Sequence, residues 1–153
     1  MINAVIVNAK RTPVGSFQGE LSSLSAPELG ARVIQNILST TSISHDIIDE
    51  VILGNVLSSG IGQAPARQAA INGGLLNTVE CSTINKMCGS GLKAVMLGEQ
   101  AIKTGDAHVV LAGGMESMTN APYLLPKARA GFRLGHAKMI DSIIHDGLWD
   151  AYN

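Results

Sequence analysis

The sequence predicts an α/β fold in which helices cover both faces of a mixed, mostly parallel sheet. Short apolar runs alternate with longer segments whose apolar residues recur at helical spacing, an order typical of parallel strands joined by right-handed crossovers. Of the 153 residues, 46% are hydrophobic, 15% are charged and 3% are aromatic. We therefore expect a core of aliphatic side chains, alanine and glycine, with little polar surface.

Four runs are expected to form strands, because each is short, apolar and bounded by turn-forming residues. They are residues 4–7, 51–53, 81–85 and 108–112.

Three helices are expected between these strands. The first begins at Ser25, which forms a capping box with Glu28. The second covers the alanine-rich residues 65–72, and the third covers residues 89–103 and ends at Gly105. Because the third is apolar on most sides, we expect it to be buried.

The character of the chain changes after residue 115. Residues 117–139 contain four basic residues, no acidic residue and two prolines, so we expect them to leave the sheet as an excursion. A last helix is expected over residues 139–148, with Ile143 and Leu148 on one face.

The overall composition excludes several classes of protein. With 11 basic and 12 acidic residues the net charge is −1, which argues against nucleic acid as a partner. The chain starts without the features of a signal peptide, and no apolar run approaches the roughly 18 residues of a membrane span. Two cysteines, Cys81 and Cys88, favour reduced thiols. We expect a cytoplasmic protein without membrane or nucleic-acid partners.

The most informative segment runs from Asn85 to Ala94, where a strand ends, Cys88 follows and a glycine-rich helix begins. Free N–H groups and the positive end of the helix dipole meet there, so the position favours an anion. Cys88 is therefore a candidate nucleophile. The backbone N–H groups of Cys88 and Gly89 are expected to support an oxyanion on an attacked acyl carbon. A small buried hydrophobic Cys88 is the alternative that the residues alone leave open.

A second interpretation of the same segment is a nucleotide site. Gly89, Gly91 and Ala94 match the variant dinucleotide fingerprint G-x-G-x-x-A. That fingerprint belongs to the first strand–helix unit and needs an acid at the end of the following strand. Here the unit is the third and Asp106 precedes its strand, so this interpretation is the weaker one.

Four blocks, in order and spread over almost all of the chain, resemble those of the thiolases. They are residues 10–15 (KRTPVG), 62–69 (GQAPARQA), 85–94 (NKMCGSGLKA) and 113–119 (GGMESMT). In the third block Cys88 matches the nucleophile of that family. The resemblance implies the thiolase fold, layered α-β-α-β-α in the full enzyme and built from two similar halves. Residues 1–116 would be the N-terminal core domain without its last strand, residues 117–153 the start of the loop domain, and the C-terminal half absent.

Residues 139–153 are similar to the acetoacetyl-CoA (biosynthetic, short-chain) thiolases, through their Asp-Gly-Leu-x-Asp-Ala-aromatic-Asn pattern. In that family the residue matching Leu148 lies near the acyl pocket. The resemblance therefore implies that Leu148 contacts substrate.

The reaction that the resemblance implies is a reversible Claisen condensation of two acetyl-CoA molecules to acetoacetyl-CoA and CoA. Cys88 would carry the acetyl group in a ping-pong acyl transfer. CoA thioesters are the implied substrates, and no metal or redox cofactor is implied. The full-length form would be a homo-oligomer, a dimer or a tetramer.

Three other family motifs are expected to lie outside residues 1–153. They are the C-terminal Gly-His motif with the base for the cysteine, a Cys-x-Gly-Gly-Gly motif with a second acid and base, and an Asn-Glu motif of the first oxyanion site. We therefore expect this chain alone to be inactive and turnover to need the C-terminal half. A non-catalytic thiolase fragment or interaction module, and a thiolase-like lipid-binding or condensing relative, are the alternatives.

The remaining polar candidates are expected to have structural or surface roles. Cys81 and His108 are assigned to strands, and Lys86 either supports the Cys88 thiolate or forms a salt bridge. The other histidines are assigned to the surface: His45, His136 and His145. The basic residues of the excursion serve either as a solvated loop or in tetramer assembly and CoA access: Lys127, Arg129, Arg133 and Lys138.

Overall fold

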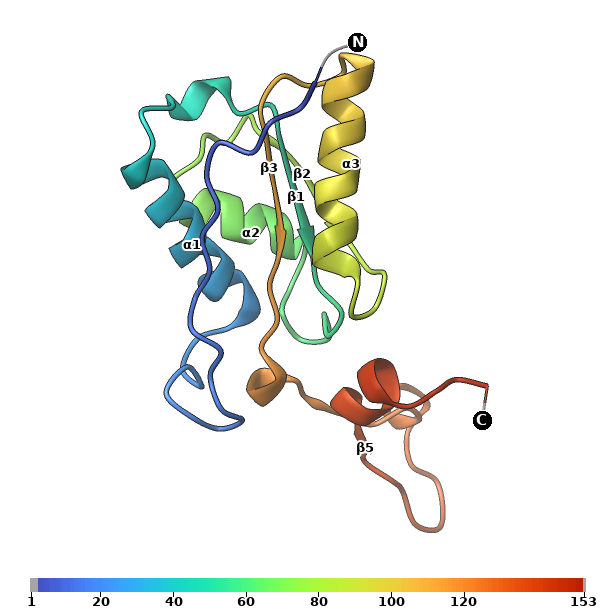
Figure 1. Cartoon of the computed structure of the whole chain (residues 1–153). Coiled ribbons are helices and arrows are strands. Elements are labelled where there is room, and N and C mark those ends of the chain that lie inside the picture. Colours follow the sequence, from blue (N-terminus) through green and yellow to red (C-terminus); the bar gives the residue numbers. More distant parts are fainter. Residues whose placement is uncertain (1–2, 153) are drawn as a thin grey trace.

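A computed structural model describes residues 3–152 and confirms most of the predicted elements (Figure 1). The helices are α1 (Ala26–Thr40), α2 (Pro65–Asn72) and α3 (Ser90–Thr104), and the core strands are β1 (Glu50–Gly54), β2 (Glu80–Ile84) and β3 (Val110–Gly114). Two short strands, β4 (Tyr123–Leu124) and β5 (Ile140–Asp141), pair antiparallel outside this core. Short helical turns occupy His45–Ile47, Met118–Asn120 and Ala128–Ala130, and a π-helical turn occupies Ile143–Leu148.

The three core strands form one parallel sheet in the order β2-β1-β3. The helices α1 and α2 pack together on one face, and α3 lies along the other face (Figure 1). In this register Gly54 lies beside both Ile84 and Gly114. The carboxyl ends of the three strands therefore lie at one edge of the sheet, where the end of β1 contacts the start of α3.

The main core lies between the sheet and the α1–α2 pair. Its buried side chains are aliphatic residues, alanine and one methionine, as the composition predicts: Ala26, Ile34, Leu38, Ile48, Val51, Leu53, Ala66, Ala69, Ala70, Leu75, Val79 and Met115. The capping box that starts α1 is formed, with Ser25 Oγ accepting from Glu28 N and Glu28 Oε2 accepting from Ser25 N at 2.7 Å. The helix thus begins where the sequence predicts.

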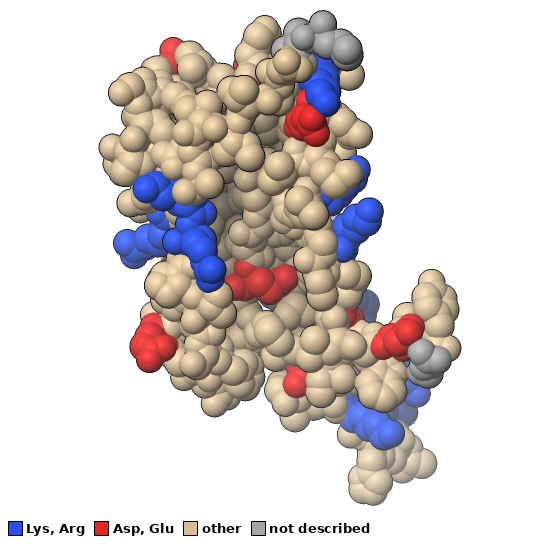
Figure 2. Space-filling model, in the orientation of Figure 1, with Lys and Arg blue, Asp and Glu red and all other residues tan. Residues whose placement is uncertain are grey.

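The prediction of a strand at residues 4–7 is wrong. Residues 3–13 are extended but pair with no strand, and the side chains of Val5, Ile6 and Val7 are 76%, 81% and 70% exposed. A hollow of about 1240 Å³ separates this segment from β3, α1 and α3. Figure 2 shows the molecule hollowed on this face, with mostly uncharged residues around the hollow. A strand needs a hydrogen-bonded neighbour, and the described chain places none within reach of residues 4–7.

Two expectations about helices also need correction. The last helix does not extend from 139 to 148, because Ile140–Asp141 pairs with β4 and only the turn Ile143–Leu148 is helical. The third helix has the predicted position, but it is not buried on all sides. Its buried residues are Ser90, Ala94 and Gly98, whereas Leu92 is 69% exposed and Val95 and Met96 are also exposed.

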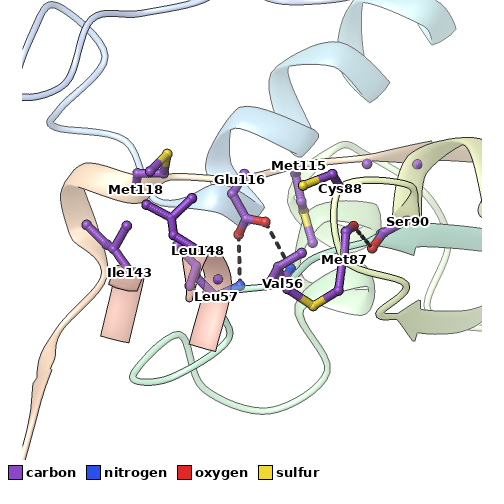
Figure 3. A pocket seen from close by; sticks show the side chains of 14 residues that line it. Val56, Leu57, Met87, Cys88, Ser90, Met115, Glu116, Met118, Ile143 and Leu148 are labelled. Carbon is purple, nitrogen blue, oxygen red and sulfur yellow. Dashed lines mark hydrogen bonds between the residues drawn. The ribbon is translucent and has the colours of Figure 1, made fainter. Parts of the chain in front are cut away.

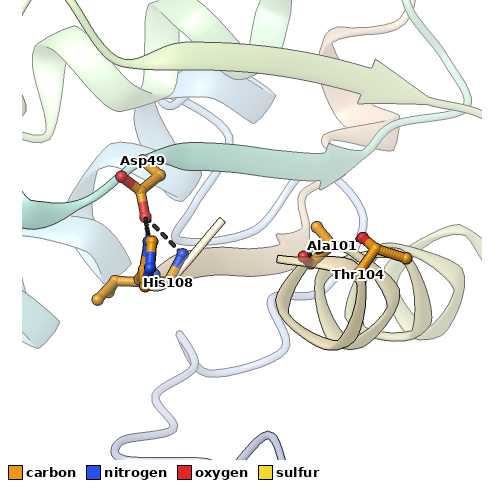
Figure 4. A network of polar contacts seen from close by, with 5 residues as sticks. Asp49, Ala101, Thr104 and His108 are labelled. Atoms are coloured by element: carbon orange, nitrogen blue, oxygen red, sulfur yellow. Dashed lines mark hydrogen bonds and ion pairs between the residues drawn. The ribbon is translucent and has the colours of Figure 1, made fainter. Parts of the chain in front are cut away.

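Asp49 joins the starts of the β1 and β3 chain segments (Figure 4). Its Oδ2 accepts from His108 N at 2.7 Å and from Val109 N at 3.0 Å, while its own N–H donates to Val109 O. The hydrogen bonds from Val109 and then His108 hold the pKa of the Asp49 carboxyl below its usual value. His108 contacts Asp49 mainly through its backbone; its ring Nδ1 lies 3.9 Å from Asp49 Oδ2, and its side chain is 89% exposed.

We predict that Asp49→Asn lowers the thermal midpoint at neutral pH and that the difference from wild type shrinks in acid. Because the folded pKa of Asp49 is lowered, its charge stabilises the fold above the unfolded pKa, and that contribution is lost as pH falls through the folded pKa. Thermal unfolding followed by circular dichroism across this range measures it. Asp106→Asn is the matched control, since Asp106 accepts from the Thr104 hydroxyl instead. An equal loss at neutral and acid pH would contradict the assignment.

Candidate active site

Cys88 lies between the end of β2 and the start of α3, one residue before the helix N-cap Gly89. Its side chain is exposed and lines a cavity of about 330 Å³ at the carboxyl edge of the sheet. Figure 3 shows the Cys88 sulfur directed into this cavity, toward Met115 and Glu116. The alternative of a small buried hydrophobic Cys88 therefore does not describe this residue.

A tight turn formed by residues 85–90 holds Cys88 at the mouth of the helix. Asn85 Oδ1 accepts from Met87 N at 2.9 Å, and Ser90 N donates to Met87 O at 3.0 Å. Gly89 N donates to Lys86 O at 3.1 Å, so in this conformation the Gly89 amide already has an acceptor. The Cys88 amide is not engaged by any acceptor among the described residues, and it is the better placed of the two amides that the sequence singled out.

Close backbone contact with β1 and β3 fixes the start of α3. A Cβ added to Gly54 would lie 2.5 Å from Ser90 Cβ and 2.6 Å from the Ser90 carbonyl carbon. Real Cβ atoms do not approach this closely, so only glycine at 54 lets the helix reach the strand ends. Gly91 lies against Gly114 less tightly, because a Cβ added to Gly91 would lie 3.6 Å from Gly114 N, an ordinary contact distance.

Glu116 fixes the loop that follows β1. Its Oε1 accepts from Asn55 Nδ2 at 2.7 Å and from Leu57 N at 3.1 Å, and its Oε2 accepts from Val56 N at 2.9 Å (Figure 3). Asn55 Nδ2 also donates to Met115 O at 3.2 Å. The carboxylate thus ties the loop after β1 to the loop after β3.

Glu116 was not among the site residues predicted from the sequence. Its position could have indicated this role, because Glu116 follows the Gly-Gly pair that ends a predicted strand. The carboxyl ends of neighbouring parallel strands lie at the same edge of a sheet, where sites commonly form.

The wall opposite Cys88 is apolar and comes mainly from the segment after β5. Leu148, singled out from the sequence, lines the cavity together with Ile143 and Met118. Leu57 Cδ2 would lie 3.2 Å from a Cβ on Gly147, so the turn at Gly147 packs directly on the loop that Glu116 holds. The structure therefore brings Cys88 and Leu148 to one cavity, although they are far apart in sequence.

The other polar candidates do not enter this cavity. Cys81 is half-buried in β2, where burial raises the pKa of its thiol. Lys86 is exposed, and no carboxylate in the described chain pairs with it. The remaining histidines and the basic residues of the excursion are exposed: His45, His136, His145, Lys127, Arg129, Arg133 and Lys138.

Within residues 3–152, no group of three or more His, Cys, Asp or Glu side chains is arranged to hold a metal ion. Every helix within this range is too short or too polar to cross a bilayer.

Comparisons with known proteins identify relatives over the full chain. Residues 4–153 match the family model "Thiolase, N-terminal domain". An acetyl-CoA acetyltransferase of Pseudomonas aeruginosa is 60% identical over 153 residues, which are 100% of this chain and 39% of that protein. One from Cupriavidus necator is 56% identical over the same 100% and 39%. The chain thus spans about two fifths of the length of these relatives.

A solved structure is also similar. Acat5 thiolase from Ascaris suum, in complex with coenzyme A, superposes with a TM-score of 0.88 and 41% identity over 93% of this chain and 37% of that chain.

We predict that Gly54→Ala lowers the free energy of unfolding by about 1–3 kcal/mol or more, because the added Cβ overpacks the contact with Ser90. Urea unfolding measures the change. Gly91→Ala is the control: its Cβ would have ordinary contacts of 3.6 Å or more, and alanine favours a helix by roughly 0.5–1 kcal/mol. Similar losses in both variants would show that the close approach at Gly54 is not what limits substitution.

Proposed function

This chain belongs to the thiolase family as its N-terminal domain, and we propose that it supplies the nucleophile of an acyl transfer between CoA thioesters. One observation carries the proposal: Cys88, exposed before α3, points into an apolar cavity at the meeting point of three strand ends. The positive end of the α3 dipole lies beside Cys88, and thiolate is the nucleophilic form of cysteine.

The reaction that fits this site is the condensation of two acetyl-CoA molecules. The Cys88 thiolate attacks the thioester carbonyl of the first, the C–S bond to CoA breaks, and the acetyl group remains on Cys88. A second acetyl-CoA loses an α-proton to a base, and its enolate carbon attacks the acetyl carbonyl. The Cys88 thiolate then leaves, the CoA thiolate released in the first step takes up the proton that the base removed, and the products are acetoacetyl-CoA and CoA. The Cys88 N–H is the proposed donor to the carbonyl oxygen as it gains negative charge.

The shape of the cavity supports a short acyl group as substrate. Its volume of about 330 Å³ is shared between the space at Cys88 and an apolar end formed by Ile143, Gly147 and Leu148. Leu57, held by the Glu116 clamp, closes that end against Gly147. We propose that Leu148 contacts the acyl group from this wall.

The base for the second half-reaction is proposed to lie outside residues 1–153. This range contains no Cys-x-Gly-Gly-Gly segment, and its Gly-His dipeptide, Gly135-His136, lies in the exposed excursion and not at the cavity. The histidines at 45, 108 and 145 are also exposed and do not line the cavity. The chain alone should therefore bind acetyl-CoA weakly, form the acetyl-Cys88 intermediate slowly and not complete the reaction. The C-terminal half of a thiolase is proposed to supply the missing acid and base groups.

The hollow beside β3 supports the view that residues 1–116 are a core domain without its last strand. β3 has β1 on one side and the hollow on the other, and the extended residues 3–13 form the far wall. We propose that one further strand fills this space, and that residues 117–153 begin a separate loop domain. The exposed face of α3 (Leu92, Val95 and Met96) would then be covered by the second half of the full-length protein.

Several finer features are part of the same proposal. We propose a homo-oligomer, a dimer or tetramer, for the full-length form, a cytoplasmic location, and acetyl-CoA, acetoacetyl-CoA and CoA as substrates, without a metal or redox cofactor. Support comes from the relatives named acetyl-CoA acetyltransferase and from the coenzyme A bound by a related thiolase.

We predict that iodoacetamide modifies Cys88 faster than Cys81 in the folded chain. Cys88 is exposed at a helix start, whereas Cys81 is half-buried and burial raises the pKa of its thiol. Peptide mapping by mass spectrometry at timed intervals gives both rates in one sample. Equal rates would contradict an activated Cys88.

Turnover is tested in the protein that carries both halves. Cys88→Ala should abolish thiolysis of acetoacetyl-CoA and the acetylated intermediate seen by intact mass, whereas Cys81→Ala should retain both. The 153-residue chain, identified by its mass of 15.9 kDa, should show no thiolysis. Thiolysis by that chain would overturn the proposed division of the machinery between two halves.

We also predict that the amides of Val110–Gly114 that point away from β1, and the amides of residues 4–7, exchange with deuterium rapidly in this chain and slowly when the second half is present. The reason is that a strand in the hollow would give these backbone groups hydrogen-bond partners. Amides of β1, which lies between β2 and β3, are the internal control and should be protected in both. Unchanged exchange at β3 would exclude a strand in the hollow.

A further inference from the structure

We propose that Ser90 is the positioning residue that holds Cys88 in its reactive place. This inference rests on the proposed role of Cys88 as nucleophile and assigns a role to its neighbour. Ser90 is 5% exposed and is the first residue of α3. It lines the same cavity as Cys88, but we argue that it acts through the turn and not on substrate.

Two hydrogen bonds of one hydroxyl close the turn around Cys88. Ser90 Oγ accepts from Lys86 N at 2.8 Å and donates to Met87 O at 2.6 Å (Figure 3). Lys86 and Met87 are the two residues before Cys88, so Ser90, two residues after Cys88, forms hydrogen bonds with the backbone that precedes it. A group that both donates and accepts is required, and a hydroxyl is the smallest side chain group that does so.

The turn needs this support because its backbone is strained. Met87 has φ +48°, in the left-handed region that residues with a side chain rarely adopt. Asn85 Oδ1 accepts from the Met87 N–H, and the Ser90 hydroxyl donates to the Met87 carbonyl oxygen. Without the hydroxyl, the Lys86 N–H loses its acceptor and Met87 can return to a common conformation, which moves the next residue, Cys88.

The hydroxyl does not serve the helix in the usual way. A serine that stabilises a helix start stands at the N-cap and accepts from the helix amides. Here the N-cap is Gly89 and has no side-chain cap, whereas Ser90 is inside the helix and directs its hydroxyl back to the turn. Close contact with Gly54 holds its Cβ in place. The geometry therefore assigns Ser90 to the turn that carries Cys88.

The test measures how fast iodoacetamide modifies Cys88 in Ser90→Ala across pH, with Cys81 as the internal reference. We expect the Cys88 rate to fall at least about tenfold and its pH profile to move, because small displacements of a reacting group have effects of this size. The Cys81 rate should not change. Ser142→Ala is the matched control: Ser142 is 1% exposed and its hydroxyl donates to Pro122 O at 2.6 Å, outside the turn.

The conservative variant separates positioning from simple packing. Ser90→Thr keeps the hydroxyl and should keep the Cys88 rate within a small factor, in protein shown to be folded by circular dichroism. If Ser90→Ala does not fold, Ser90→Thr decides alone: a folded variant with a slow Cys88 overturns the inference, and one with a fast Cys88 supports it.

The outcomes also distinguish the inference from the function on which it rests. A fast Cys88 in wild type and in Ser90→Ala would overturn the role of Ser90 and leave the nucleophile intact. A Cys88 no faster than Cys81 in wild type would overturn the nucleophile itself. A fall in rate shared by Ser142→Ala would mean general loosening, which also overturns the assignment.

Discussion

The close approach of α3 to the strand ends is the constraint on which the site depends. Gly54 ends β1 without a side chain, so Ser90 and the first turn of α3 pack directly on the backbone of the sheet. That contact sets where β2 must end, how tightly residues 85–90 must turn, and where Cys88 stands. A larger residue at 54 would push the helix start away from the sheet, and the cavity at Cys88 would open with it.

Two carboxylates, Asp49 and Glu116, hold β1 and β3 together at opposite ends of the pair. Asp49 binds the backbone at the start of the β3 segment, and Glu116, after its end, binds the loop that follows β1. The β1–β3 pair is therefore tied at both ends by a side chain from one segment to the backbone of the other. Because charged acceptors make stronger hydrogen bonds, these ties give the cavity a wall that does not depend on apolar packing alone.

Local signals were sufficient wherever an element needs only its own residues. The capping box of Ser25 and Glu28 places the start of α1, and Gly105, with φ +83°, ends α3. The same signals failed where an element depends on a neighbour. Residues 4–7 have a strand-like composition but no partner, and Ile140–Asp141 joined β4 in preference to a helix. The apolar surface of α3 is partly exposed. The prediction of a buried helix was wrong on this point, because composition does not say which face of a helix is covered.

The sequence by itself determined the α/β class, the places of most helices and strands, and Cys88 as the residue to test. Those features follow from residue periodicity, from caps and from a short ordered set of family blocks. Only the tertiary structure decided which other residues surround Cys88 beside Leu148: Glu116 and Leu57 from the strand ends, and the hydroxyl of Ser90. Glu116, Leu57 and Cys88 are far apart in sequence and become neighbours only when parallel strands bring their carboxyl ends to one edge of the sheet. A local sequence pattern does not contain that information.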